Sequence, residues 1–149
     1  MSEITFSEIG VADIDELLPL FLAYRVFYKR EPMPEESRAY MTARFQAGDY
    51  TGFLARIGGK AVGFAIMSRT FSSGVMKPIW LLNDIFVDPT MRKAGVGAAL
   101  MAKVEAHARA TGATRVDLFT ARDNNIAQSV YTRAGWKRDE IFYRYIKTF

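Results

Sequence analysis

One stretch near the middle of the chain constrains the fold more than any other, because it joins an apolar run, a proline stop and a glycine-bearing helix start. Residues 80–87 are mostly large and apolar, as in a buried strand. Asp88 and Pro89 end that strand, since proline has no N–H for a ladder. From Gly95 onward the apolar residues return at the spacing of one helix face. The order strand, loop, helix predicts a mixed α/β fold whose sheet is covered by helices.

The start of that helix has the features of an anion site. Its first N–H groups lack partners and the helix dipole is positive there, so a diphosphate fits. Gly95 and Gly97 let an anion approach the backbone, and Arg92 and Lys93 add positive charge. A Rossmann fingerprint would need a third glycine where Leu100 stands, and the chain has no Gly-Lys-Ser/Thr of a P-loop. A glycine-rich turn that binds nothing is the alternative.

The order strand, loop, Arg-x-x-Gly-x-Gly, helix resembles the coenzyme-A-binding motif of the GNAT superfamily of N-acetyltransferases. A second block resembles the other hallmark of that superfamily, Asn-x-x-Ala-x-x-x-Tyr-x-x-x-Gly-aromatic. The matching residues are Asn124, Ala127, Tyr131, Gly135 and Trp136. Asn124 is expected to cap a helix on which Ala127 and Tyr131 share a face, and Gly135 is expected to end it. The nearest branch looks like the histone and D-amino-acid N-acetyltransferases.

The resemblance implies the GNAT acyl-CoA N-acyltransferase fold as a single domain over residues 1–149, in the order β-α-α-β-β-β-α-β-α-β. The patterning agrees with that order. Six strands are predicted, at residues 4–9, 53–57, 61–71, 80–87, 114–120 and 141–146. Helices are predicted after residues 13, 34, 95 and 124.

Composition excludes several classes of site. The chain has no cysteine and one histidine, His107, so we expect no disulfide framework, no thiol nucleophile and no metal site. The net charge of +4 comes from scattered Lys and Arg, which favours a solvated surface over a nucleic-acid footprint. The chain shows no apolar run of about 18 residues and no signal-peptide pattern, so we expect a cytoplasmic protein without a membrane partner.

The resemblance assigns the donor site to acetyl-CoA. The strand before the glycine loop should splay from the strand after it and pair its free backbone groups with the pantetheine arm. The expected cofactor-binding residues are Ile85, Phe86, Val87, Arg92, Lys93, Ala94, Gly95, Val96, Gly97, Asn124 and Ala127.

The expected reaction is attack of a primary amine on the acetyl thioester. By resemblance, Tyr131 is the acid that protonates the leaving thiolate, since a phenol can donate to a forming thiolate. Asp84 is the preferred base or water-positioning group, because it is a lone carboxylate in an apolar strand. The alternative is a structural Asp paired with an arginine or a backbone group. Asn83 stands where related polyamine acetyltransferases often carry Glu, and an amide can only orient a water.

The acceptor site is expected around the first helix and the loop after it, with Tyr24, Arg25, Tyr28 and Asn83 as substrate-binding residues. The aromatic rings can flank an ammonium group. Arg25 either holds an acceptor carboxylate or faces solvent. The acceptor class is expected to be a small-molecule amine, an amino acid or a polyamine-like molecule. A protein lysine or N-terminal acetyltransferase and a non-catalytic acyl-CoA-binding module remain alternatives. The aromatic C-terminal strand suggests a homodimer.

Overall fold

The computed structural model describes residues 3–149, which form two compact units, one up to Phe119 and one from Thr120 to Phe149. The single domain expected over residues 1–149 stays a prediction, and the two units are described separately. The first unit contains β1 (Ile4–Glu8), α1 (Ile14–Phe27), α2 (Pro34–Gln46), β2 (Tyr50–Ile57), β3 (Lys60–Ser72), β4 (Lys77–Val87), α3 (Val96–Ala110) and β5 (Val116–Leu118). Short 3-10 helices η1 (Val11–Asp13) and η2 (Pro89–Ala94) precede α1 and α3. The second unit contains α4 (Asn125–Arg133).

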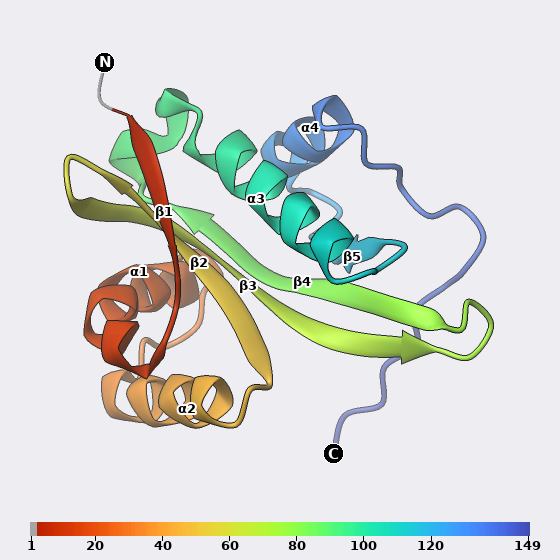
Figure 1. Cartoon of the computed structure of the whole chain (residues 1–149), viewed down its shortest axis with the longest axis horizontal. Helices are drawn as coiled ribbons and strands as arrows, with labels where there is room; N and C mark the ends of the chain where they lie inside the picture. The colour runs from red at the N-terminus through yellow and green to blue at the C-terminus, as the bar shows by residue number, and fades with distance from the viewer. Residues whose placement is uncertain (1–2) are drawn as a thin grey trace. The chain divides into compact units, whose positions relative to one another are not determined.

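The first unit is a five-stranded mixed sheet in the order β1-β2-β3-β4-β5. The first four strands are antiparallel neighbours, and β5 runs parallel to β4. Figure 1 shows α1 and α2 on one face of this sheet and α3 on the other. The mixed α/β fold predicted from the sequence is confirmed, and the first five predicted strands all form.

The core of this unit lies where β3 and β4 meet the two helix layers. Phe64 and Ile66 of β3 and Leu17 of α1 are fully buried on the α1 side. Val96, Leu100, Met101, Val104 and Ala108 form the buried face of α3, at the spacing that the sequence predicted. His107 lies at the boundary of α3 and packs edge-on against Phe53 and Trp80. Burial of these apolar faces is what fixes the helices on the sheet.

Strand β4 is irregular at the point where it leaves its parallel neighbour. β5 pairs with it only over Trp80 to Leu82, whereas β4 continues to Val87. On the β3 side the register passes from Met67↔Leu82 to Ile66↔Asp84, so Asn83 is the extra residue of a β-bulge. Pairing between β4 and β5 therefore ends with β5 at Leu118, and the splay that the resemblance implies stays a prediction.

In the second unit, the residues of the second motif form the cap and the end of helix α4. The Asn124 side chain accepts a hydrogen bond from the Ala127 N–H at 3.2 Å and caps α4. Gly135 has φ +90°, and the N–H groups of Gly135 and Trp136 donate to the carbonyls of Thr132 and Tyr131 at 3.0 Å each. These two bonds are a Schellman motif, which the Tyr131–Trp136 ring contact at 6.4 Å closes.

The sixth predicted strand, residues 141–146, is not formed, so the expected order ends at α4 and the prediction of a final strand is wrong. Residues 137–149 are irregular, and the side chains of Phe142, Tyr143, Tyr145 and Ile146 are 71–92% exposed. Alternation of apolar and polar residues makes a strand only where another strand offers hydrogen bonds. Among residues 3–149 no strand pairs with this segment.

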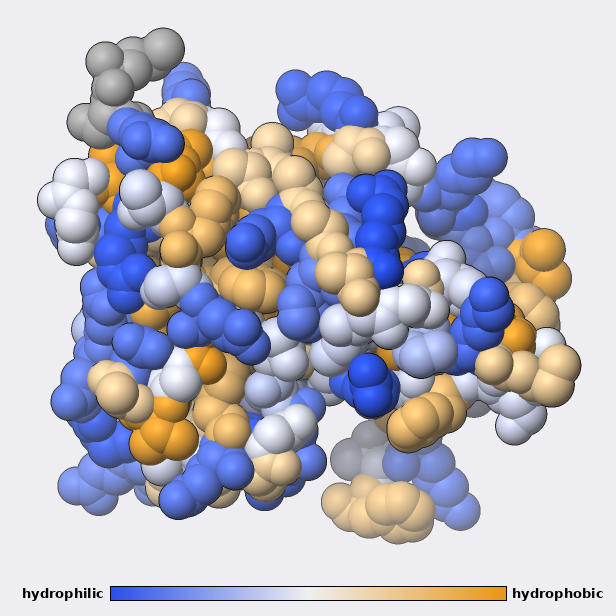
Figure 2. Space-filling view, in the orientation of Figure 1, coloured by the Kyte–Doolittle hydropathy of each residue, from blue (hydrophilic) through white to orange (hydrophobic). Residues whose placement is uncertain are grey.

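None of the helices formed by residues 3–149 combines the length and the apolar character that crossing a bilayer requires. Figure 2 shows hydrophilic and hydrophobic residues interspersed over the region of α1 and α2, without one continuous apolar face.

Candidate functional site

The far end of β4 has one edge that no neighbouring strand of residues 3–119 covers. In the ladder with β3, Asp88 N–H donates to the Val62 carbonyl at 2.8 Å, and Phe86 faces Phe64. Because hydrogen-bonded residues alternate along an antiparallel pair, Phe86 directs its backbone groups toward β3, and Ile85 and Val87 direct theirs to the opposite edge. Within residues 3–119 no strand pairs with that edge beyond Leu82. Three residues were predicted to bind a pantetheine arm through the backbone. Ile85 and Val87 direct backbone groups to the open edge, as that role requires. Phe86 directs its backbone groups to β3, so its predicted backbone role does not fit, and its ring packs among the aromatic residues beside α1.

The N-terminus of α3 lies directly after this edge. Gly95 has φ +81° and forms the N-cap, and no side chain of residues 3–149 caps the helix. A Cβ at Gly95 would meet nothing within 4 Å, so the space in front of the helix is open. Arg92, Lys93 and Ala94 form the exposed end of η2, whereas Val96 is buried under the helix. Uncapped amides, open space and nearby cations fit a diphosphate group.

Strand β4 is connected to this helix by a turn that the Asp88 side chain holds. Its carboxylate accepts from the N–H and the hydroxyl of Thr90 at 2.9 and 2.8 Å. These hydrogen bonds lower the pKa of Asp88, so the carboxylate stays ionised and keeps the turn closed at neutral pH. The sequence predicted a loop here, and the structure adds the 3-10 helix η2.

Arg92 folds back over the aromatic end of α1. Its guanidinium carbon lies 4.9 Å from the ring centre of Phe27 and 5.6 Å from that of Phe86. Its Nε donates to the Val87 carbonyl at 3.3 Å. The same side chain thus contacts the open edge of β4 and the aromatic residues near it.

Asp84 is half-buried on the face of β4 that α1 covers. Burial raises the pKa of its carboxyl group above the usual range, and a hydrogen bond from the Tyr24 hydroxyl partly offsets that rise. The pKa of Tyr24 is raised in turn, by burial and by the nearby Asp84 carboxylate, so the phenol stays protonated and acts as the donor. Burial and the Asp84 charge also raise the pKa of Tyr28, while the Arg92 charge opposes the rise.

Aromatic rings surround this carboxylate. Tyr24 lies 4.9 Å from Tyr28, 5.9 Å from Phe64 and 6.1 Å from Phe86, centre to centre. Phe27 adds an edge contact to Phe86 at 6.2 Å. The structure therefore brings Tyr24, Tyr28 and Asp84 together with the rings of Phe27 and Phe86, and their role as an acceptor site stays a prediction. Phe27 was also among the aromatic residues that the sequence offered for the acceptor region, and its i, i+3 spacing from Tyr24 puts both on one helix face.

The two polar residues predicted beside the acceptor have local partners. Arg25 donates from Nε to the Glu31 carbonyl at 2.7 Å and from Nη2 to the Met33 sulfur at 3.6 Å. The guanidinium thus holds the loop between α1 and α2. Asn83, in the bulge, accepts from the Ser68 hydroxyl at 2.6 Å.

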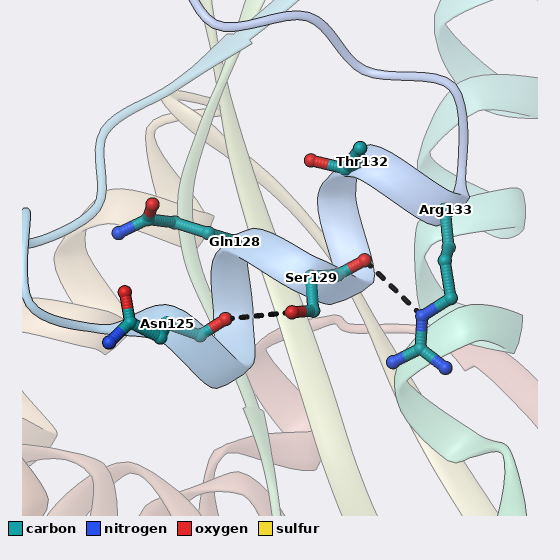
Figure 3. A pocket seen from close by; sticks show the side chains of 5 residues that line it. All are labelled: Asn125, Gln128, Ser129, Thr132 and Arg133. Atoms are coloured by element: carbon teal, nitrogen blue, oxygen red, sulfur yellow. Dashed lines mark hydrogen bonds between the residues drawn. The ribbon is translucent and has the colours of Figure 1, made fainter.

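In the second unit, Tyr131 and Ala127 are half-buried on one side of α4. Figure 3 shows a hollow along the same helix, lined by Asn125, Gln128, Ser129, Thr132 and Arg133. The Ser129 hydroxyl donates to the Asn125 carbonyl at 3.0 Å, and Arg133 Nε donates to the Ser129 carbonyl at 3.3 Å. These side chains bind their own helix backbone, and none of the predicted site residues lines the hollow. Across residues 3–149 no three His, Cys, Asp or Glu side chains cluster in a way that could hold a metal ion.

Comparison with known families agrees with this geometry. The family model described as the acetyltransferase (GNAT) family matches residues 15–136. An uncharacterized N-acetyltransferase of Bacillus subtilis, YhfO, is 34% identical over 134 residues, which cover 90% of each chain. A D-amino-acid N-acetyltransferase of Saccharomyces cerevisiae, HPA3, is 31% identical over 86 residues, 58% of this chain and 53% of that protein.

Solved structures match over almost the whole chain. The crystal structure of a probable acetyltransferase has a TM-score of 0.90 at 30% identity and covers 97% of this chain and 98% of its own. The aminoglycoside N-acetyltransferase AAC(6')-Iy in complex with CoA has a TM-score of 0.80 at 25% identity, with 99% of this chain and 96% of its own covered.

Proposed function

The chain belongs to the GNAT acetyltransferase family, and on that premise we propose that it acetylates the primary amine of a small molecule by direct attack on the thioester of acetyl-CoA. The observation that carries the proposal is the arrangement along β4. A half-buried carboxylate among aromatic rings, Asp84, directly precedes the backbone edge at Ile85 and Val87 and the uncapped helix start at Gly95. An amine site and a donor site thus adjoin on one strand.

The donor site uses backbone more than side chains. Acetyl-CoA supplies an acetyl group activated as a thioester. The backbone groups of Ile85 and the carbonyl of Val87 bind its pantetheine amides as an added strand would. The amides at Val96 and Gly97 bind the pyrophosphate together with Arg92. Asn124 and Ala127 are assigned to acetyl-CoA binding as well, because they match the second motif of the family.

Asp84 prepares the amine for attack. An alkyl amine has a pKa near 10.4 and is mostly protonated at pH 7, so it must lose a proton before its nitrogen can attack the carbonyl carbon. Asp84 takes that proton, directly or through a water oriented by Asn83. Burial moves the pKa of Asp84 upward, toward neutral pH, and a general base works best when its pKa lies near the working pH.

Two further groups assist the breaking of the C–S bond. The phenol of Tyr131 donates a proton to the departing sulfur, and the Val87 N–H donates to the thioester oxygen as its negative charge grows. Donation from Tyr131 leaves coenzyme A as the free thiol. Tyr131 is assigned this role because it stands at the tyrosine position of the second family motif.

The acceptor is proposed to be cationic in its resting form. The rings of Tyr24, Phe27, Tyr28 and Phe86 offer faces to an ammonium, and Asp84 offers the opposite charge. An acceptor carboxylate at Arg25 would have to compete with the Glu31 carbonyl and the Met33 sulfur. That competition favours polyamine-like amines over amino acids. Aminoglycosides, named for one of the similar structures, carry several such amines and belong in the panel.

An acetyl-transfer screen tests the proposal. Release of the coenzyme A thiol is followed with amino acids, polyamines, aminoglycosides and lysine peptides as acceptors. We expect saturable turnover with at least one small amine and less with peptides. Preference for lysine peptides would support a protein acetyltransferase, and saturable acetyl-CoA binding without turnover on any acceptor would support a binding module.

A further inference from the structure

Arg92 contacts the proposed amine site and the proposed donor site with one side chain. Its guanidinium carbon lies 4.9 Å from the ring centre of Phe27 and 5.6 Å from that of Phe86, the position of a cation bound to aromatic rings. Its Nε donates at 3.3 Å to the Val87 carbonyl, on the edge of β4 assigned to the pantetheine arm. Its backbone lies in the last turn of η2, just before the helix start at Gly95. The ring faces under the guanidinium are closed to any other cation.

We propose that the ring pair of Phe27 and Phe86 is a subsite for one cationic group of the acceptor, and that Arg92 is an internal competitor for it, which leaves the rings when the diphosphate of acetyl-CoA draws the guanidinium to the start of α3. The inference rests on the proposed function, in which an amine binds beside these rings. The place is open to exchange of one cation for another, because Phe27 is 49% exposed and Arg92 is itself exposed.

The contacts available to Arg92 differ in strength in the direction that this exchange needs. An exposed cation–π contact and a long hydrogen bond hold a side chain weakly. A diphosphate offers the guanidinium charge-assisted, bidentate hydrogen bonds, which are shorter and stronger. It also neutralises the Arg92 charge, which acts on the nearby Tyr28 and opposes the approach of a second cation. Binding of acetyl-CoA should therefore raise the affinity for the amine, and the amine should raise the affinity for acetyl-CoA by the same factor.

The test measures amine binding without turnover. Spermidine and kanamycin, a polyamine and an aminoglycoside, are titrated by calorimetry into the free protein and into protein saturated with coenzyme A, which has no acetyl group to transfer. In the wild type we expect coenzyme A to raise amine affinity about tenfold, within the usual range of coupling between two sites. Arg92→Met keeps a long side chain and removes the charge, so the free variant should bind the amine more tightly than the free wild type. Coenzyme A should then change that affinity by less than about threefold, because the competitor is already gone.

Lys93→Met is the matched control, because it removes the neighbouring charge, which lies over no aromatic ring of residues 3–149. With coenzyme A at saturation this variant should keep the coupling of the wild type. A second measurement follows the guanidinium itself by NMR. The Arg92 Nε–H signal, assigned by its loss in Arg92→Met, should carry the shift that nearby aromatic rings cause and should lose it when coenzyme A is added.

The outcomes separate this inference from the proposed function. Coupling that persists in Arg92→Met would come from the charge of coenzyme A alone and overturns the role of Arg92, whatever the enzyme acetylates. An Arg92 signal that keeps its ring shift at saturating coenzyme A overturns it as well. If neither amine binds any form of the protein, the subsite is refuted, and acetylation of another small amine in the screen would still leave the proposed acetyl transfer standing.

Discussion

Asp84 is a half-buried carboxyl group whose pKa is raised by burial, and a raised pKa is what the catalytic proposal asks of a base. Burial raises its pKa, and Tyr24 limits the rise. Asp84 was a candidate from the sequence because a carboxylate is rare in an apolar strand. Its partner could not be predicted, because Tyr24 and Asp84 lie on α1 and β4 and meet only through tertiary packing.

Tyr131 allows an equally local test at the residue scale. Tyr131→Phe keeps the ring that closes the end of α4 on Trp136, so acetyl-CoA affinity should be retained. If the phenol protonates the leaving thiolate, turnover should fall by about 10²–10⁴-fold, the usual range for general acid catalysis. Steady-state kinetics and calorimetry measure the two effects separately, with Tyr40→Phe as the control. Turnover within about threefold of wild type would remove Tyr131 from the mechanism, since that lies far below the acid–base range.

At the scale of elements, the sequence predicted the four α-helices and the five strands formed by residues 3–149, because each carries its own period and its own end signals. α3 starts one residue after Gly95, and α4 has both the cap and the stop that its motif indicates. The bulge at Asn83 and the 3-10 helix η2 had no such signal, since both depend on how β4 meets its neighbours. The prediction of a last strand at residues 141–146 was wrong for a related reason: periodicity cannot show whether another strand is there to pair with it.

The helix start at Gly95 can be tested as an element. A side chain there would be strained at φ +81° and would project into the open space in front of α3. Gly95→Leu should weaken acetyl-CoA binding by about tenfold or more, a loss of about 1.4 kcal/mol. Gly48→Leu is a matched control, because Gly48 also has positive φ, at +73°, with open space around it and no place in the site. Calorimetry at two salt concentrations measures both variants. Equal affinities for Gly95→Leu and wild type would exclude the pyrophosphate from this position.

At the scale of the whole molecule, the C-terminal segment carries a run of exposed apolar residues. Phe142, Tyr143, Tyr145, Ile146 and Phe149 are largely exposed. Exposed apolar residues gathered in one segment mark an interaction surface more often than a solvated tail. We propose that this segment pairs with a second copy of the chain and so makes a homodimer.

Light scattering across micromolar concentrations should give a mass twice that of one chain. Replacing Phe142 and Ile146 by serine should shift the molecule toward the monomer, because it removes apolar area from the proposed contact. A monomer at high micromolar concentration in the wild-type chain would refute the dimer and leave the donor site as described.

The most direct test of the central claim, that Asp84 prepares an amine for attack on acetyl-CoA, counts both products of one reaction. Free coenzyme A thiol and N-acetylated amine are measured together, in wild type and in Asp84→Asn, on the best acceptor of the screen. We expect one thiol per acetylated amine in the wild type. In Asp84→Asn we expect turnover reduced by about 10²-fold or more with acetyl-CoA affinity unchanged, since an amide cannot take a proton. Thiol release without acetylated amine, or an Asp84→Asn variant with wild-type turnover, would contradict the account.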